Sequence, residues 1–264
     1  MPELPEVETI VRFLRPKIRG KRILSMEIRG RRVARGHKNP QELNRAVAGR
    51  KISEVNRTGK NIILELSGGA RLAIHLMMTG RLFWNPKEKQ IHDRLVLKLS
   101  GGNDLVFNDI RQFGWCRVLK PSGKLAGPDV LSLGFNEFKS LVSPRPALIK
   151  NLLLNQKVIS GIGNIYSDEI LWYACLRPTR RANTFSGREL KKFYQAMRHV
   201  LLLAIKKEGT SSRDYRKPDG TEGGYYKIRK AYQRAGKQCL RDGATIKRIK
   251  IGSRSAHFCP KHQK

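Results

Sequence analysis

The first residues of the chain place a candidate nucleophile beside a carboxylic acid. The chain opens Met1-Pro2-Glu3, and removal of Met1, which processing usually permits before a small residue, leaves Pro2 with a free secondary amine. An α-amino group titrates near pH ~8 and a lysine side chain near ~10.4, so a useful fraction of Pro2 is unprotonated at neutral pH. Such an amine can attack a sugar aldehyde carbon and form an iminium, with Glu3 as proton donor or acceptor. The alternative is that Pro2 only opens the helix that follows.

The composition is strongly basic. The chain has 54 Lys plus Arg against 21 Asp plus Glu, a formal charge of +33 over 264 residues. A positive field of this size attracts polyanions, above all nucleic acid, and predicts salt-sensitive binding. A ribosomal protein or a binder of anionic membranes are the other classes with this charge. We find neither a run of about 18 apolar residues nor a signal-peptide pattern, and therefore expect a cytoplasmic protein without membrane association.

Hydrophobic periodicity divides the chain into a strand-rich and a helix-rich part. Apolar residues from Val7 to Ile18 recur at helical spacing and predict a first helix. Short β-type segments follow at 22–28, 51–56, 61–66, 71–77, 95–99, 105–108 and 115–119, several bounded by turn residues. Helical periodicity predominates later, at 136–142, 147–154, 164–175 and 187–207, where Ser186 and Glu189 have capping-box spacing.

We therefore expect an α+β fold. Residues 1–120 form a β-sandwich led by a helix, and residues 121–132 form a Pro/Gly-rich linker. Residues 133–229 form a helical domain. Residues 230–264 form a basic segment that contains a β-hairpin around Gly252. The Gly-rich polar stretch 208–229 is too long for an ordinary connection, so it is either disordered or a functional lid.

Four motifs, taken in order, resemble the formamidopyrimidine-DNA glycosylase family, which shares its architecture with endonuclease VIII. They are the opening Met1 to Glu8, the segment 57–61 around Lys60, the turn from Gly161 to Asn164, and the Cys-bearing basic tail. The resemblance spans essentially the whole chain. It implies that the helical domain is a helix-two-turns-helix element and that the hairpin is a zinc-finger-like finger.

The activity that the resemblance implies is a bifunctional DNA glycosylase and abasic-site lyase of base excision repair. By this resemblance Pro2 attacks C1′ of the damaged nucleotide, Glu3 assists opening of the sugar ring, Glu6 supports the site, and Lys60 contacts a phosphate and helps base loss. The strand is then cleaved by β,δ-elimination. The Leu4-Pro5 variant of the opening favours oxidised purines, namely 8-oxoguanine and formamidopyrimidines.

The resemblance also implies a set of DNA contacts. A glycosylase that acts within a duplex must extrude the nucleotide and fill the vacated stack. Insertion is assigned to Met78, Arg111 and Phe113, whose flexible thioether, guanidinium and aromatic ring suit a wedge between bases. Taken singly, Met78 and Phe113 are more often core residues. Ile110 stands where the family often has proline, and Met77 where it often has glycine. These two differences bear on the shape of the loops and not on the role of the inserting residues.

Further contacts follow from the turn, the tail and the Gly-rich loop. Backbone N–H groups at the start of a helix can bind a phosphate, which suits Gly163 and Asn164. Lys157, just ahead of this turn, is a further phosphate candidate. The resemblance adds the finger arginine Arg254 as a phosphate ligand and Arg111 as a DNA-binding residue. It matches the Gly-rich loop 208–229 to a lesion-capping loop, whose candidate base contacts are Thr210, Ser211, Tyr225 and Tyr226.

The tail keeps the spacing of a zinc finger but changes two ligands. Where the family pattern has four cysteines, the chain has Cys239-x2-Asp242-x16-Cys259-x2-His262. Aspartate oxygen and histidine nitrogen both coordinate zinc, so we expect one structural zinc ion. The alternatives are that Asp242-Gly243 forms a hairpin turn without metal, or that His257 is the fourth ligand.

Two other functions remain open from the sequence. One is an oxidised-pyrimidine glycosylase of the endonuclease VIII type, and the other is a non-catalytic DNA-binding protein that keeps the fold and the charge. In each case we expect the partner to be double-stranded DNA. If the protein is an enzyme, this DNA contains oxidised bases or abasic sites. We also expect a monomer that is associated with the nucleoid of a bacterial-type cytoplasm.

Overall fold

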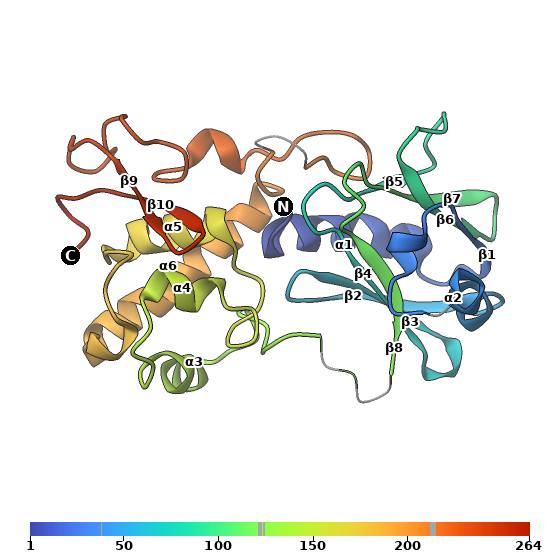
Figure 1. Cartoon of the computed structure of the whole chain (residues 1–264), viewed down its shortest axis with the longest axis horizontal. Coiled ribbons are helices and arrows are strands. Elements are labelled where there is room, and N and C mark those ends of the chain that lie inside the picture. The colour runs from blue at the N-terminus through green and yellow to red at the C-terminus, as the bar shows by residue number, and fades with distance from the viewer. Residues whose placement is uncertain (38, 121–122, 124, 212–214) are drawn as a thin grey trace. The chain divides into compact units, whose positions relative to one another are not determined.

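The computed structural model of residues 1–264 describes the whole chain except 38, 121–122, 124 and 212–214 (Figure 1). The chain splits into two compact units, Met1–Leu125 with Lys207–Gly224, and Ala126–Lys206 with Tyr225–Lys264. The predicted linker 121–132 lies partly outside the described residues, and the predicted domain bounds stay a proposal.

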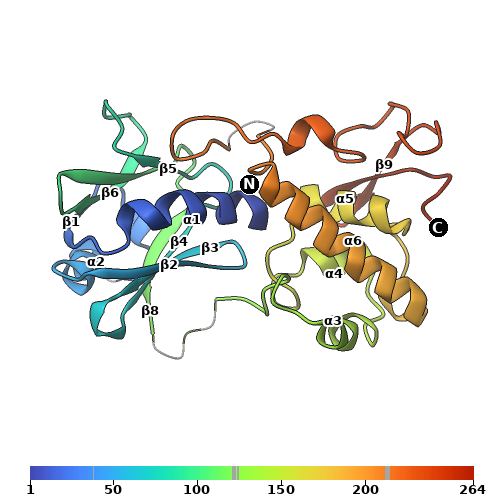
Figure 2. The same cartoon turned by 180° about the vertical axis from the view of Figure 1, so that it is seen from behind.

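The first unit contains one long helix and two antiparallel sheets. Helix α1 (Leu4–Ile18) buries an apolar face that includes Val7, Val11 and Leu14, as its spacing predicts. It packs against β2 and β3, along which it runs in the view of Figure 2. One sheet has the order β1 (Ile23–Ile28), β6 (Asp93–Leu99), β7 (Asn103–Asn108), β5 (Arg81–Trp84). The other has the order β2 (Ile52–Thr58), β3 (Asn61–Leu66), β4 (Arg71–His75), β8 (Trp115–Leu119).

One α-helix and one strand of this unit were not predicted. Helix α2 (Pro40–Val47) is only 8 residues long, and its buried residues are a single pair at helical spacing, Leu43 and Val47, which is too short a pattern to detect. Its start is nevertheless marked, because the Asn39 side chain accepts the Gln41 N–H and Pro40 occupies the first turn. Strand β5 has four residues with one buried side chain, too few for an alternating pattern. The short helices η1 (Arg31–Ala34) and η2 (Ser67–Gly69) complete this unit.

The second unit is helical and ends in a β-hairpin. Its helices are α3 (Phe135–Val142), α4 (Ile149–Leu154), α5 (Asn164–Ala174), η3 (Ala182–Thr184), α6 (Gly187–Lys206) and η4 (Tyr225–Ile228). Helix α5 packs against α4, α6 and β10. The predicted capping box of α6 is confirmed, since Ser186 N–H donates to Glu189 Oε2 at 2.9 Å and Glu189 N–H donates to Ser186 Oγ at 3.3 Å. Strands β9 (Lys247–Ile251) and β10 (Arg254–Phe258) form the predicted hairpin.

None of the helices in the described part of the chain has both the length and the apolar character that crossing a bilayer requires.

Candidate functional site

A buried carboxylate holds the N-terminal residues of α1. Glu6 is 1 % exposed, and its Oε2 accepts the backbone N–H of Glu3 at 2.7 Å. Its Oε1 accepts the backbone N–H of Thr210 at 2.7 Å. Gly209 has a φ of +84°, and a Cβ there would lie 2.9 Å from the Glu6 side chain, so the close approach requires glycine. Glu6 therefore joins the start of α1 to the Gly-rich loop.

Lys60 lies in the turn between β2 and β3, beside α1. The guanidinium of Arg57 bridges the two elements, because Nε donates to Glu8 Oε2 of α1 at 2.9 Å and Nη1 donates to the Gly59 carbonyl at 3.0 Å. Lys60 is 6 % exposed. The turn that carries this lysine is thus fixed against the helix that Pro2 and Glu3 precede.

His75 is a residue of this region that the sequence did not reveal as a site candidate. It pairs with Asn61 across β3 and β4, and its Nδ1 accepts the backbone N–H of Met77 at 2.9 Å. Burial, together with the positive charge of Lys60, lowers the pKa of His75 to about 4. The ring is therefore neutral at pH 7, and because Nδ1 is an acceptor, Nε2 carries the hydrogen. The only sequence signal was a histidine at a strand end.

The three predicted insertion residues lie together at the surface of the first unit. Arg111 Nη1 donates to Met78 Sδ at 3.3 Å, and its guanidinium lies 4.6 Å from the centroid of the Phe113 ring. Met78 and Phe113 are 37 % and 36 % exposed. Two partly exposed apolar side chains and a guanidinium thus lie side by side, as the predicted insertion requires.

The four residues predicted for base contact are divided between the two units. Thr210 is buried with its N–H on Glu6, and Ser211 Oγ accepts the Gly223 N–H at 2.9 Å. Both belong to the first unit, whereas Tyr225 and Tyr226 belong to the second. Tyr225 is 1 % exposed, with its ring 5.4 Å from that of Tyr166, so it packs in the core of its unit. Tyr226 is half-buried, with the Arg229 guanidinium 3.6 Å from its ring centroid.

The Gly161–Asn164 turn is fixed by a glutamine that the sequence did not single out. Gln156 Nε2 donates to the Ile162 carbonyl at 2.7 Å, and its Oε1 accepts the Gly161 N–H at 3.1 Å. Gly163 is the N-cap of α5, and Asn164 its first residue. Asn164 Oδ1 is buried without a hydrogen-bond partner among the described residues. Lys157 is exposed just ahead of the turn.

A buried ionic network fixes the hairpin to α5. Lys150 Nζ contacts Asp168 Oδ1 at 2.6 Å, and both side chains are fully buried. Asp168 Oδ2 accepts the backbone N–H of His257 at 3.0 Å and lies 2.8 Å from its Nδ1. Arg254 is exposed at the start of β10, opposite Ile251 across the turn. The strand that carries Arg254 is therefore positioned by the helix that begins at Asn164.

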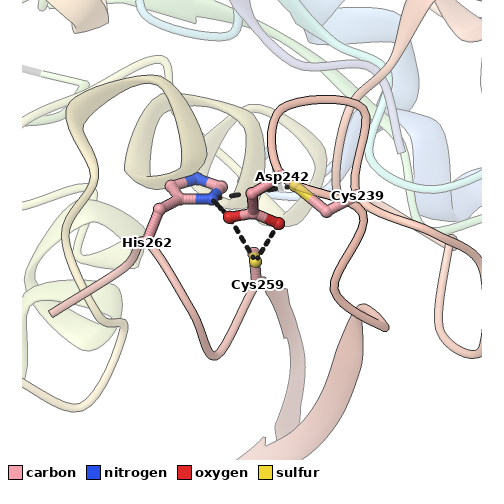
Figure 3. A group of neighbouring side chains, drawn as sticks. All are labelled: Cys239, Asp242, Cys259 and His262. Carbon is pink, nitrogen blue, oxygen red and sulfur yellow. Dashed lines mark hydrogen bonds and ion pairs between the residues drawn. The ribbon is translucent and has the colours of Figure 1, made fainter.

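Cys239, Asp242, Cys259 and His262 converge, as Figure 3 shows, and their ligand atoms all lie within 4.8 Å of one another. Cys259 Sγ is 3.3 Å from both Asp242 carboxylate oxygens. His262 Nδ1 is 2.7 Å from Asp242 Oδ2 and 3.7 Å from Cys239 Sγ. With bonds of about 2.3 Å to sulfur and about 2.0 Å to nitrogen, the ligand atoms of a tetrahedral zinc site lie roughly 3.3–3.8 Å apart.

This donor set fits a zinc ion. Zinc accepts cysteine sulfur, aspartate oxygen and histidine nitrogen as ligands, and the four side chains complete a set of four. The Trp172 indole N–H donates to Cys239 Sγ at 3.4 Å, a contact of the kind that orients metal ligands. His257 is not part of this group, because its Nδ1 is engaged by Asp168.

Comparison with known proteins agrees with these features. Residues 1–116 match the Formamidopyrimidine-DNA glycosylase N-terminal domain, and residues 127–216 match the Formamidopyrimidine-DNA glycosylase H2TH domain. The Formamidopyrimidine-DNA glycosylase of Solibacter usitatus is 40 % identical over 268 residues, with both chains fully covered. The chain belongs to the formamidopyrimidine-DNA glycosylase family. The relative from Carboxydothermus hydrogenoformans is 39 % identical, again over the full length of both chains.

Solved structures of this family confirm the predicted fold class. The Lactococcus lactis Fpg in complex with DNA that contains an abasic site matches with a TM-score of 0.91 and 31 % identity, over all of both chains. A mutant of the same protein, in complex with DNA containing Fapy-dG, matches with the same TM-score, identity and coverage. The resemblance drawn from the four motifs is thus confirmed, as are the β-sandwich, the helix-two-turns-helix element and the hairpin.

Proposed function

We propose that the chain is a bifunctional DNA glycosylase and abasic-site lyase of base excision repair that acts through Pro2. The observation that carries this proposal is the buried Glu6, which fixes the backbone of Glu3 and the start of α1 while Arg57 fixes the Lys60 turn against the same helix. A protein that only bound phosphates would need no such arrangement around its N-terminus. The family membership supports the same activity.

The proposed reaction begins when removal of Met1 converts the Pro2 nitrogen from an amide to an amine. This amine attacks C1′ of the damaged nucleotide, the base leaves with the electron pair of the glycosidic bond and is protonated, and Glu3 delivers a proton to the sugar ring oxygen. The resulting iminium acidifies the C2′ proton. Loss of this proton breaks the bond to the 3′ phosphate, and a second elimination breaks the bond to the 5′ phosphate. Lys60 supports base loss from a phosphate contact.

The proposed phosphate contacts lie on the second unit, and the proposed base-stack contacts lie on the first. Gly163 and Asn164 at the start of α5, Lys157 ahead of it, and Arg254 of the hairpin bind phosphates. Arg111 acts with Met78 and Phe113, which enter the stack that the extruded nucleotide vacates. The partner is double-stranded DNA with oxidised bases or abasic sites, in line with the DNA held by the Lactococcus lactis relatives. The protein acts as a monomer at the bacterial nucleoid.

The proposed substrates are oxidised purines. The residues proposed for contact with the flipped base are Thr210, Ser211, Tyr225 and Tyr226, of which Tyr225 is buried within the second unit. Cys239, Asp242, Cys259 and His262 are proposed to bind one structural zinc ion, which takes no part in the reaction and stabilises the hairpin that presents Arg254.

The activity is tested by comparing release of 8-oxoguanine and of thymine glycol from otherwise identical duplexes. We expect faster release of 8-oxoguanine, and no release of either base by a protein whose N-terminus keeps an uncleaved tag. The tagged protein should retain salt-sensitive DNA binding, which controls for folding. Faster release of thymine glycol would favour the endonuclease VIII type. Binding without release of either base by the untagged protein would favour a non-catalytic DNA-binding protein.

A further inference from the structure

The wedge residues sit on two loops whose backbones are unusual. Met78 belongs to the loop 76–80 between β4 and β5, and Arg111 and Phe113 to the loop 109–114 between β7 and β8. Met77 and Gln112, next to the wedge residues, have φ values of +51° and +54°. Residues other than glycine rarely adopt this left-handed conformation, because Cβ then crowds the backbone. Other contacts must therefore hold both loops.

Asp109 supplies these contacts from inside the unit. It is 1 % exposed, its Oδ1 accepts the Thr79 hydroxyl at 2.5 Å, and its Oδ2 accepts the Gly114 N–H at 2.8 Å. The Thr79 hydroxyl oxygen in turn accepts the backbone N–H of Arg111 at 3.3 Å. One carboxylate thus joins the loop of Met78 to both ends of the loop that carries Arg111 and Phe113.

Arg35 holds the second loop through its carbonyl groups. Its Nη2 donates to the Gln112 carbonyl at 3.1 Å, to the Gly114 carbonyl at 3.3 Å, and also to that of Phe113. These three carbonyls belong to the left-handed residue Gln112 and the two residues that follow it. Asp109 and Arg35 together engage the donors and the acceptors of the same six-residue loop.

We propose that Asp109 and Arg35 are positioning residues that hold Met78, Arg111 and Phe113 as a preformed wedge before DNA arrives. This inference rests on the proposed function, because a wedge acts only where a base stack must be opened. A loop that is already ordered loses less conformational entropy on binding. The two residues should therefore matter for base excision from a duplex, and not for cleavage of a single-stranded abasic site, where no stack needs filling.

The test compares D109N and R35A with the matched control R32A. Arg32 is exposed in the same basic segment, so R32A removes an equal charge, and it keeps the Arg32 carbonyl that accepts Arg35 Nε at 3.2 Å. Each protein is assayed for single-turnover release of 8-oxoguanine from a duplex and for cleavage of a single-stranded abasic oligonucleotide. Insertion of the wedge is followed by the fluorescence of 2-aminopurine placed opposite an abasic-site analogue in a duplex.

Displacement of an active group by about 1 Å can cost ~100-fold in rate, so we expect D109N and R35A to slow duplex excision by about tenfold or more. Both D109N and R35A should reduce the 2-aminopurine signal and leave single-strand cleavage unchanged. R32A should behave like the wild type in all three assays. Equal losses on both substrates, or full duplex activity in R35A, would overturn the inference. R35A changes an exposed residue, so it decides the matter even if D109N misfolds. A wild-type protein that cleaves neither substrate would contradict the proposed function instead, and the fluorescence signal would still test the wedge.

Discussion

Glu6 Oε1 accepts the backbone N–H of Thr210 at 2.7 Å although the two residues are 204 positions apart. The same carboxylate holds the N–H of Glu3. The residues proposed for catalysis and the loop proposed to cover the damaged base are therefore joined by one buried side chain. Displacement of the loop and displacement of the N-terminus are coupled through this side chain.

Replacing Glu6 with glutamine should damage both stability and catalysis. The glutamine NH2 group would face a backbone N–H, so one buried donor loses its partner, at a cost of about 1–3 kcal/mol in the free energy of unfolding. Chemical denaturation measures this cost, and strand cleavage at an abasic site measures the effect on catalysis. The control E42Q changes an exposed carboxylate on α2 and should alter neither. An E6Q protein with wild-type stability and cleavage would show that the carboxylate charge is not needed.

His75 should make the protein less stable in mild acid. Its pKa is lowered to about 4 in the folded state, from an ordinary value of 6.5, because the ring is buried near Lys60. The unfolded chain therefore binds the proton first, so stability is complete above about pH 6.5 and falls as the pH drops toward 4. In H75N the amide oxygen can still accept the Met77 N–H but cannot titrate. The loss of unfolding free energy between about pH 7 and about pH 4.5 should be smaller in H75N by roughly 2 kcal/mol. An identical loss in both proteins would contradict the burial of a neutral imidazole.

Removal of the proposed metal should destabilise the hairpin. The purified protein should contain one zinc ion by elemental analysis, and a chelator should lower its melting temperature, since a ligand that binds only the folded state stabilises it. Because the Trp172 N–H donates to Cys239 Sγ, chelation should also change the tryptophan fluorescence, and this change should be absent in W172F. A metal-free protein that is insensitive to chelation would mean that the four side chains are held by hydrogen bonds alone.

Arg254 and Asn164 should affect DNA binding differently. Loss of one charged phosphate contact in R254A should reduce the slope of log affinity against log salt by about 1. Asn164 is neutral, so N164A should weaken binding with no change in slope. Filter binding or fluorescence anisotropy across a salt series measures both, and R254K is the control that keeps the charge. An unchanged slope in R254A would remove Arg254 from the phosphate contacts.

Much of the fold follows from local patterns in the sequence. The apolar face of α1 and the Ser186–Glu189 capping box are local signals, and the structure has both. Helix α2 and strand β5 are short and bury few side chains, so periodicity could not reveal them. The signal for α2 was the pair Asn39-Pro40, an N-cap followed by proline.

The candidate site was only partly predictable, because its supporting contacts are long-range. Cys239 and Asp242 are close together in the sequence, and so are Cys259 and His262. This spacing predicted a group that the structure brings together. No sequence pattern links Arg35 to residues 112–114, or Asp168 to His257. These contacts depend on how the sheets and the hairpin pack. For Met77, in contrast, the sequence did carry a signal. The family often has glycine at this position, and Met77 has a φ of +51°, which glycine adopts more easily than other residues do.

The most direct test of the central proposal is borohydride trapping on a duplex that carries 8-oxoguanine opposite cytosine, with mass spectrometry of the linked peptide. We predict a covalent adduct at the nitrogen of Pro2, which requires both the iminium and the removal of Met1. Tight DNA binding with no adduct, or an adduct at a lysine side chain, would contradict the proposal that Pro2 is the nucleophile.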